Sequence, residues 1–302
     1  MKKRYLILII LIIFISGCTG SISPLGSGPN GIQIKFIQPE DSSLSRGLDE
    51  GSSLPIEIEL TNYAECRVNG ELCIKDTLSD TYGGVNEQCK NIDFEEARIN
   101  NKKLELDQQK FIFSSQPYLN LFKDQETNLQ ATVKYNCDIL TGPRRLCTQS
   151  PFEKDETKCK NFETISGNNL GSKTAPITVA SIDKQLSLGA SNEVRLKTII
   201  TLRKMSKGFV SAFNEEQDSL KGNPVIIEVD YANSLMSCSG RDYKEGVLLW
   251  KSKDTEKVIN CEILLNSGDL QENPLNIHLK YDYEISEKKL IKINHIEKEE
   301  GN

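Results

Sequence analysis

Apolar and polar residues alternate in many short stretches of this chain. Ile32, Ile34 and Phe36 alternate with polar residues, and residues 56–61 read Ile-Glu-Ile-Glu-Leu-Thr. A period of two places the apolar side chains on one face of a β-strand. Two later strands are expected at 103–113 and 128–139, and seven more at 176–183, 193–202, 224–231, 246–250, 257–265, 275–285 and 289–296. Short strands separated by turn signals favour β-sandwiches, so we predict an all-β fold.

An internal repeat divides the chain. Residues 129–139, LQATVKYNCDI, align without gaps to residues 275–285, LNIHLKYDYEI, and 55–60 align more weakly to 224–229. The repeat predicts two tandem sandwich domains, at 31–174 and 175–302. The matched strand comes late in each domain, as strand F does in an immunoglobulin-like sandwich, and Tyr135 stands where a tyrosine corner would. The architecture therefore resembles two immunoglobulin-like domains.

The first 17 residues form a secretory signal by layout. Lys2, Lys3 and Arg4 precede an apolar run at 5–15. As a helix this run spans about 17 Å, against roughly 30 Å for a bilayer core, so it is too short for a transmembrane span. It ends in Ile-Ser-Gly-Cys, which resembles the lipobox of bacterial and archaeal lipoproteins. That resemblance implies removal of residues 1–17 and lipidation of Cys18. A non-lipidated signal and a short uncleaved anchor are the alternatives.

Residues 19–30, TGSISPLGSGPN, are typical of a flexible tether. Cys18 and this tether form the predicted segment 18–30, which would hold the domains at the extracytoplasmic face of the cell membrane through lipid. With its lipobox and tandem sandwiches, the chain resembles surface lipoproteins of archaea and bacteria.

The charge balance excludes one class of partner. The chain has 37 Lys and Arg against 43 Asp and Glu, and loss of residues 1–17 leaves 34 − 43 = −9. A protein this acidic is a poor match for nucleic acid. No basic run is present that would dock an anionic membrane surface, so attachment depends on the lipid.

The cysteines indicate disulfides. Nine are present, and setting Cys18 aside leaves eight, six before residue 160 and two after it. An even number suits an exported, disulfide-bonded protein, and no Cys-x₂₋₄-Cys spacing suggests zinc. Cys238 and Cys261 are then expected to pair. Cys147 with Cys159 and Cys73 with Cys89 would each close a polar loop, leaving Cys66 with Cys137, although other pairings in the first domain stay open.

No catalytic motif is found, and we expect neither an enzyme nor a cofactor. His278 is expected to face solvent, and the acid pairs at 95–96, 215–216 and 299–300 read as solvated surface. Two further sets of residues have a suggestive spacing. Asp76, Asp80, Asp93, Glu95 and Glu96 surround a Gly-Gly loop and could offer oxygen ligands to Ca²⁺, but their spacing matches no defined site. Met205, Phe209 and Phe213 recur every four residues, which predicts one face of a short helix.

The sequence therefore favours a membrane-anchored, non-catalytic surface module, for binding or for structure. Its partner would be another cell-envelope protein or a glycan, contacted through loops at one end of the first domain. A surface hydrolase with an unrecognised carboxylate site is one alternative. A solute-binding lipoprotein is the other, although such proteins are built from α/β lobes and the chain lacks an alternating strand–helix pattern.

Overall fold

The computed structural model describes residues 30–40, 46–100, 103–152, 159–171, 173–189, 193–211, 223–266 and 269–297. They are almost entirely strand, which confirms the all-β prediction. Among them are one short α-helix, α3 (Ser79–Tyr82), and one 3-10 helix (Gly167–Leu170). None of the helices in these ranges is long and apolar enough to cross a membrane. The predictions for residues 1–17, for Cys18 and for the tether as far as residue 29 lie outside the described residues.

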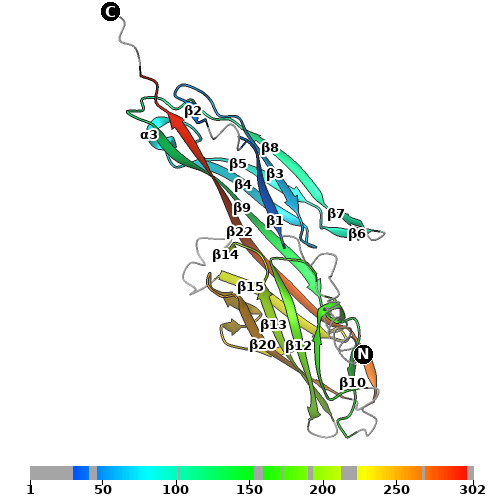
Figure 1. Cartoon of the computed structure of the whole chain (residues 1–302). Coiled ribbons are helices and arrows are strands. Elements are labelled where there is room, and N and C mark those ends of the chain that lie inside the picture. Colours follow the sequence, from blue (N-terminus) through cyan, green and yellow to red (C-terminus); the bar gives the residue numbers. More distant parts are fainter. Residues whose placement is uncertain are drawn as a thin grey trace, which may run out of the picture.

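The first half of the molecule, residues 30–141, is built from two facing sheets (Figure 1). One sheet has the order β1-β3-β8, and the other contains β5-β4-β9. The alternation in the sequence sets which side chains face inward, since Ile56, Ile58 and Leu60 of β3 are all buried. The bounds are β1 (Ile32–Gln38), β3 (Ile56–Asn62), β4 (Val68–Asp76), β5 (Gln88–Phe94), β8 (Asp107–Phe113) and β9 (Gln125–Thr141).

The second half, residues 142–297, also pairs two sheets. One has the order β11-β12-β13-β20-β17, and the other contains β19-β15-β22. The bounds are β11 (Phe162–Ser166), β12 (Ile177–Leu188), β13 (Val194–Lys204), β15 (Asn223–Tyr231), β17 (Ser237–Ser239), β19 (Val247–Trp250), β20 (Glu256–Leu265) and β22 (Leu275–Asn294).

Short strands trim the edges and ends of these sheets. β2 pairs with β22, β14 also pairs with β22, β16 with β15, β18 with β19, β6 with β7 and β10 with β21. Their bounds are β2 (Leu48–Asp49), β6 (Arg98–Asn100), β7 (Lys103–Glu105), β10 (Leu146–Thr148), β14 (Phe209–Ser211), β16 (Ser234–Leu235), β18 (Tyr243–Lys244) and β21 (Gln271–Asn273). The strand β14 replaces the helix predicted across 205–213. That prediction was wrong for Phe209, and Phe213 lies outside the described residues.

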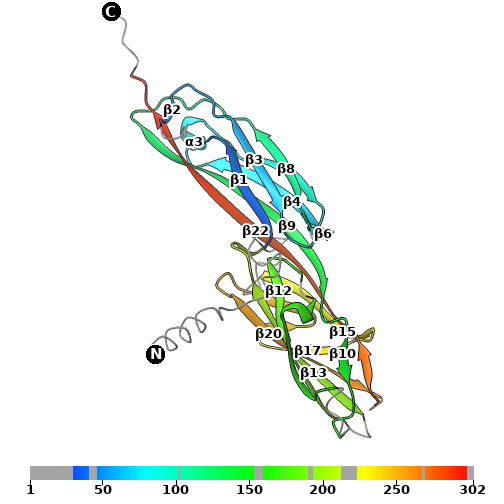
Figure 2. The ribbon, with the colours of Figure 1, turned by 45° about the vertical axis from the view of Figure 1, so that its right-hand side comes forward.

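Two long strands run through both halves. β9 and β22 pair antiparallel over 17 residue pairs, from Gln125 opposite Ile293 to Thr141 opposite Ile277. β22 has 20 residues, so it extends over about 66 Å at a rise of roughly 3.3 Å per residue. Both views show the two strands passing from one body to the other (Figures 1 and 2). A single ten-stranded sheet with the path β18-β19-β15-β22-β9-β4-β5 therefore joins the halves.

The internal repeat has a structural meaning in this sheet. The repeat relates each β9 residue to the β22 residue 146 positions later, and Asn136 lies directly opposite its own counterpart, Asp282. β4 and β5 then correspond to β15 and β19, and β1-β3-β8 to β12-β13-β20. The strand connections follow an approximate two-fold axis through the Asn136–Asp282 pair. The repeated strands are neighbours in one sheet, and each completes the sheet of the other half.

The predicted domain bounds stay a prediction, but the pairing adds a fact about them. β10 and β11 fall within the range 31–174 predicted for the first domain. β10 pairs with β21 and β11 pairs with β12, so both strands pack with the second half.

The region where β9 and β22 pass between the halves, which we call the waist, is filled by three tyrosines. The ring of Tyr283 lies 5.9 Å from that of Tyr135 and 6.4 Å from that of Tyr281. Tyr135 and Tyr281 are repeat counterparts with the same task. The Tyr281 hydroxyl accepts a hydrogen bond from the Ile177 amide at 3.0 Å, and the Tyr135 hydroxyl accepts one from the Ile32 amide at 3.5 Å.

Tyr135 is therefore not a tyrosine corner. The hydroxyl of a tyrosine corner bonds the backbone a few residues upstream, whereas that of Tyr135 reaches the first strand of its half. Burial raises the pKa of both Tyr135 and Tyr281, so their hydroxyls stay protonated. They tie β9 to β1 in the first half and β22 to the corresponding strand, β12, in the second half.

Candidate functional site

Four disulfides form, and they are the four pairs that the sequence analysis expected. They join Cys66 to Cys137, Cys73 to Cys89, Cys147 to Cys159 and Cys238 to Cys261. Two of these pairs lie directly opposite each other on neighbouring strands, Cys73–Cys89 between β4 and β5 and Cys238–Cys261 between β17 and β20. All eight sulfur atoms are thereby removed from nucleophilic or metal-binding chemistry.

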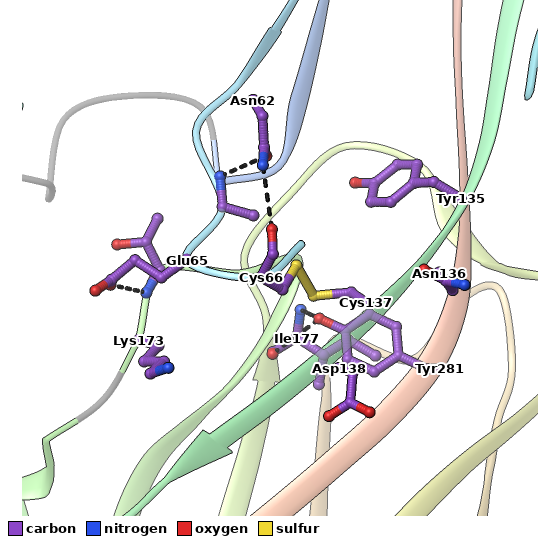
Figure 3. The surroundings of a disulfide bond; sticks show 12 residues. Asn62, Glu65, Cys66, Tyr135, Asn136, Cys137, Asp138, Lys173, Ile177 and Tyr281 are labelled. Carbon is purple, nitrogen blue, oxygen red and sulfur yellow. Dashed lines mark hydrogen bonds between the residues drawn. A yellow bond between two sulfur atoms is a disulfide. The ribbon is translucent and has the colours of Figure 1, made fainter. Parts of the chain in front are cut away.

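The Cys66–Cys137 disulfide pins a loop to β9 beside the waist (Figure 3). The loop is ordered by the buried Asn62, whose side-chain nitrogen donates to the Cys66 carbonyl and whose side-chain oxygen accepts from the Ala64 amide. Glu65 accepts from the Thr174 amide at 2.6 Å, which links this loop of the first half to the segment that precedes β12 in the second half. These contacts are structural, because every polar group named here already has a protein partner.

The residues considered for metal binding do not assemble a site. Among the described residues, only Glu71, Cys73 and Cys89 bring three candidate ligand atoms together, and both of those cysteines are in a disulfide. Of the acids considered for Ca²⁺, Asp76 is buried and accepts from the Leu78 and Val85 amides and from the Tyr118 hydroxyl. Its oxygens order the loop around α3.

The remaining acids of that set turn to the protein surface. Asp93 pairs with Arg67 at 2.9 Å, and Glu95 and Glu96 both lie near Arg98. Asp80 is exposed on α3. A calcium site needs six to eight convergent oxygens, and these side chains point to different partners.

The groups that could serve catalysis are also dispersed. His278 is exposed as expected and lies beside Asp138 on the outer face of the large sheet, while the Nδ1 atom of His295 lies 2.8 Å from Glu50. Burial raises the pKa of Asp282 to about 6, but it faces Asn136 rather than a second carboxylate. The acid pairs at 215–216 and 299–300 lie outside the described residues.

The most site-like feature is a pocket of about 740 Å³ in the second half. β10, which borders it, lies toward the end of that half away from the first (Figures 1 and 2). We call it the basic pocket. Its polar lining includes Arg144, Arg145, Lys160, Glu163, Asn168 and Asn169.

The local chain path explains how this pocket forms. Gly142 ends β9 with a φ of 132°, and a Cβ there would lie only 2.0 Å from the Leu275 carbonyl oxygen, so the turn requires glycine. The chain then passes Arg144 and Arg145 and enters β10. The Cys147–Cys159 disulfide, which also lines the pocket, holds β10 to the chain that leads into β11. The described residues of this stretch that line the pocket, from Pro143 to Cys147 and from Cys159 to Gly171, are thus joined by one covalent link.

Among the residues that the structure describes, the lining of the basic pocket has a positive net charge. The one acid among them, Glu163, lies 3.2 Å from the amino group of the fully buried Lys184, which also donates to the Cys147 carbonyl at 3.0 Å. Arg145 lies 3.9 Å from Glu272. Arg144 and Lys160 form no ion pair within the ranges that the structure describes. The negative charge of Glu163 is neutralised by the buried Lys184. The charges of Arg144, Arg145 and Lys160 face solvent.

The sequence did not predict this pocket. For this region it predicted only a polar loop closed by Cys147 and Cys159. The available signal was the Arg144–Arg145 pair placed directly after Gly-Pro and just before a cysteine. Lys160 is 15 residues beyond Arg145 in the sequence, so its approach depends on a disulfide whose partner residues the sequence left open.

Comparison with known proteins does not assign a role to the site. The chain matches no protein-family model and no curated protein.

Proposed function

We propose that this chain is a lipid-anchored, extracytoplasmic module that binds or supports another component of the cell envelope and has no catalytic role. The four disulfides support a location outside the cytoplasm, because disulfides persist in oxidising compartments and are rare in reducing ones. The signal-like segment 1–17 and the lipobox-like end at Cys18 support the anchor.

The strand order supports an immunoglobulin-like relation for each half. β1, β3 and β8 stand in the places of strands A, B and E, while β5, β4 and β9 stand in those of C′, C and F. The place of strand G beside β9 is taken by β22, and β9 takes the same place beside β22. Sandwiches of this architecture serve widely as binding and structural modules, which is an argument by analogy of fold.

The observation that carries the proposal is the shared β9–β22 ladder. Its 17 residue pairs make the two halves one stiff body, where tandem domains joined by a linker would move independently. Loops at the two ends are thereby held at a fixed separation. Such a body suits a spacer or a binding scaffold, whose task is to hold surfaces in place.

The point where the tether would join adds to this picture. The side chain of Asn30 donates to the Met205 carbonyl at 3.3 Å, and Ile32 is bonded to Tyr135 at the waist. A membrane tether that precedes residue 30 would therefore hold the body near its middle. Both ends would then be free for partners.

The two alternatives fit less well. A glycoside hydrolase uses two carboxyl groups about 5–10 Å apart. Among the described residues that line the basic pocket, Glu163 is the one acid, and it forms an ion pair with Lys184. Solute-binding lipoproteins close two α/β lobes around their ligand, whereas in both halves here the sheets pair antiparallel, apart from the short parallel pair of β2 with β22.

The anchor is tested by fractionating cells that express the full-length protein and its Cys18→Ser variant. We expect the wild type in the membrane fraction, with a lipid adduct on Cys18 in the mass spectrum of its N-terminal peptide. The variant should move to the soluble extracytoplasmic fraction with its disulfides intact. Retention of the variant in membranes would contradict the lipid anchor.

The absence of catalysis is tested separately. The full-length protein in detergent is incubated with a panel of hydrolase substrates, alongside Glu163→Gln and Asp282→Asn variants. We expect no turnover. Turnover by the wild type that either substitution abolishes would replace the module with the hydrolase alternative.

A further inference from the structure

We infer that the basic pocket binds a saccharide that carries carboxylate groups, as an acidic envelope glycan does. This inference rests on the proposed function as a binding module, and it names the class of partner and the place where it binds.

The charge of the basic pocket selects the sign of the ligand. Arg144 and Lys160 have no ion-pair partner in the described parts of the chain, and Arg145 reaches Glu272 only at 3.9 Å. The protein around them is acidic overall, so a surplus of positive charge in a recess is not explained by general surface composition. A concave site lined by one sign of charge concentrates ligands of the opposite sign.

The side chains that carry the positive charge favour a ligand with carboxylate groups. A guanidinium group offers a planar pair of N–H donors that matches the two oxygens of a carboxylate. Arg144 and Arg145 are adjacent in the chain and both line the pocket. Lys160, across the disulfide, supplies a third cation of a different shape. This set suits a ligand with more than one acidic group.

The neutral lining favours a saccharide over a bare anion. Asn168, Asn169 and Thr164 also line the basic pocket, and their amides and hydroxyl can both donate to and accept from sugar hydroxyls. Its volume of about 740 Å³ falls within the roughly 300–1,000 Å³ of small-molecule sites. Inorganic phosphate would leave most of this volume and these amides unused.

The site is also held in shape before a ligand arrives. The Cys147–Cys159 disulfide forms part of the wall, and Lys184 is bonded beneath it to the Cys147 carbonyl. β11, which carries Glu163 and Thr164, is paired along its length with β12. A preformed wall lowers the ordering cost of binding.

The test is calorimetric titration of the full-length protein in detergent with trigalacturonate. The methyl ester of the same trisaccharide, which lacks the charges, and sodium phosphate are titrated in parallel. We expect binding of trigalacturonate that weakens as salt is added, no measurable binding of the ester, and weaker binding of phosphate. Arg144→Gln and Lys160→Gln should each lower the affinity by about tenfold, the loss of one charge-assisted contact.

Arg241→Gln is the matched control, since Arg241 is exposed and does not line the pocket. It should leave the affinity unchanged, and circular dichroism should show that all three variants fold. Equal binding of the ester, equal or tighter binding of phosphate, no binding at all, or affinities unaffected by both pocket substitutions would each overturn the inference. A protein that is membrane-anchored through Cys18 yet fails this titration would refute the pocket and leave the anchored module standing.

Discussion

In each half a loop is held to a long strand, by a disulfide in the first half and by hydrogen bonds in the second. In the first half, Cys137 of β9 is bonded to Cys66 in the loop that precedes β4. Tyr283 holds the counterpart position of Cys137 in β22, 146 residues later. Its hydroxyl lies 3.0 Å from the Ser206 carbonyl and 3.2 Å from the Lys207 carbonyl, in the loop that precedes β14.

The loop residue that corresponds to Cys66 is Gly208. Its φ is 107°, and a Cβ there would lie 2.3 Å from the Glu284 carbonyl oxygen and 2.9 Å from the Tyr283 ring. The backbone conformation, the Glu284 carbonyl and the Tyr283 ring therefore all require glycine at this position. The loop before β4 is held to β9 by a disulfide, and the corresponding loop before β14 is held to β22 by hydrogen bonds.

The two halves also differ in the strand that follows this loop. In the first half β4 is continuous, whereas in the second half the corresponding segment is split into β14 and β15. Gly70 of β4 lies opposite Tyr135, and Val225 lies opposite Tyr281, an offset of 225 − 70 = 155. Val210 lies opposite Tyr283 and corresponds to Val68, an offset of 210 − 68 = 142. The second half thus carries 155 − 142 = 13 additional residues after the loop that is hydrogen-bonded to Tyr283. We call this hydrogen-bonded contact the non-covalent fastening and the Cys66–Cys137 disulfide the covalent fastening.

The largest expected effect is loss of the covalent fastening. The Cys66→Ser, Cys137→Ser double variant opens a link across 71 residues, which should lower the free energy of unfolding by about 4 kcal/mol. Chemical denaturation followed by circular dichroism and by the fluorescence of Trp250, the single tryptophan, measures it. Because the ladder couples the halves, we expect both probes to shift together, although Trp250 lies in the second half.

The matched control removes the Cys73–Cys89 disulfide, which spans 16 residues and should cost about 3 kcal/mol by the same entropic argument. If the Trp250 transition stays unchanged while the circular dichroism transition shifts, the two halves unfold independently and the coupling is refuted.

The next effect concerns the centre of the ladder, where Asp282 faces Asn136. Burial raises the pKa of Asp282 to about 6 in the folded protein, above its ordinary value near 4. The folded state thus binds the proton more tightly, so this group favours folding below about pH 4 and that contribution is lost as pH rises through 6. Asp282 is only half-buried, so solvent screens part of this effect. We therefore expect Asp282→Asn to remove a pH-dependent loss of about 1–2 kcal/mol between pH 4 and 7.

Denaturation at several pH values compares this variant with the wild type. Asn136→Asp is the informative partner, because it places two carboxylates opposite each other and should steepen the same loss. An Asp282→Asn variant with the pH profile of the wild type would show that Asp282 is solvated and titrates normally.

Removal of the non-covalent fastening should cost less than removal of the disulfide. Tyr283→Phe keeps the ring and deletes the hydroxyl that reaches the Ser206 and Lys207 carbonyls. The expected loss is about 1–2 kcal/mol, typical of a buried hydrogen bond whose acceptors are left without a donor. A loss as large as that of the Cys66–Cys137 variant would mean that the two fastenings are equivalent in strength.

The smallest expected effect is the difference in stability between variants of the two counterpart tyrosines, Tyr135 and Tyr281. The Tyr281 hydroxyl both accepts from the Ile177 amide and donates to the Ile177 carbonyl, whereas Tyr135 accepts only the longer bond from Ile32. Tyr281→Phe should therefore lower the free energy of unfolding by about 1 kcal/mol and Tyr135→Phe by roughly half of that. Denaturation curves of the two variants, measured side by side, give the order. The reverse order would contradict the geometry at the waist.

Local pattern made much of the fold predictable. Period-two alternation located most strands, because one face of each is buried, and the even division of cysteines led to the four pairs. The repeat at 129–139 and 275–285 correctly marked equivalent strands. Similarity alone does not say whether equivalent strands lie in separate sandwiches or beside each other, since strand pairing is a long-range property. The repeat predicted two tandem sandwiches, whereas in the structure β9 pairs with β22 in one sheet.

Strand β14 and the basic pocket could not be predicted either, because both depend on contacts between residues far apart in the sequence. The spacing of Met205 and Phe209 suits a helix, but pairing with β22 makes Phe209 part of a strand, so tertiary contacts overrode a short local pattern. The basic pocket depends on Lys160 approaching Arg144 and Arg145, which a disulfide and two strand pairings bring about. No local pattern records that approach.

The shared ladder also has a consequence for the order in which the protein is made. One edge of β9 stays unpaired until β22 has been synthesised as far as Ile293. Tyr135, for example, pairs with Tyr283, which is 148 residues later in the chain. At roughly 5–20 residues per second this takes on the order of 10–30 s. During that time one edge of β9 is an open template for pairing with other chains. The nascent first half therefore needs protection until its closing strand, borrowed from the very end of the second half, has been synthesised.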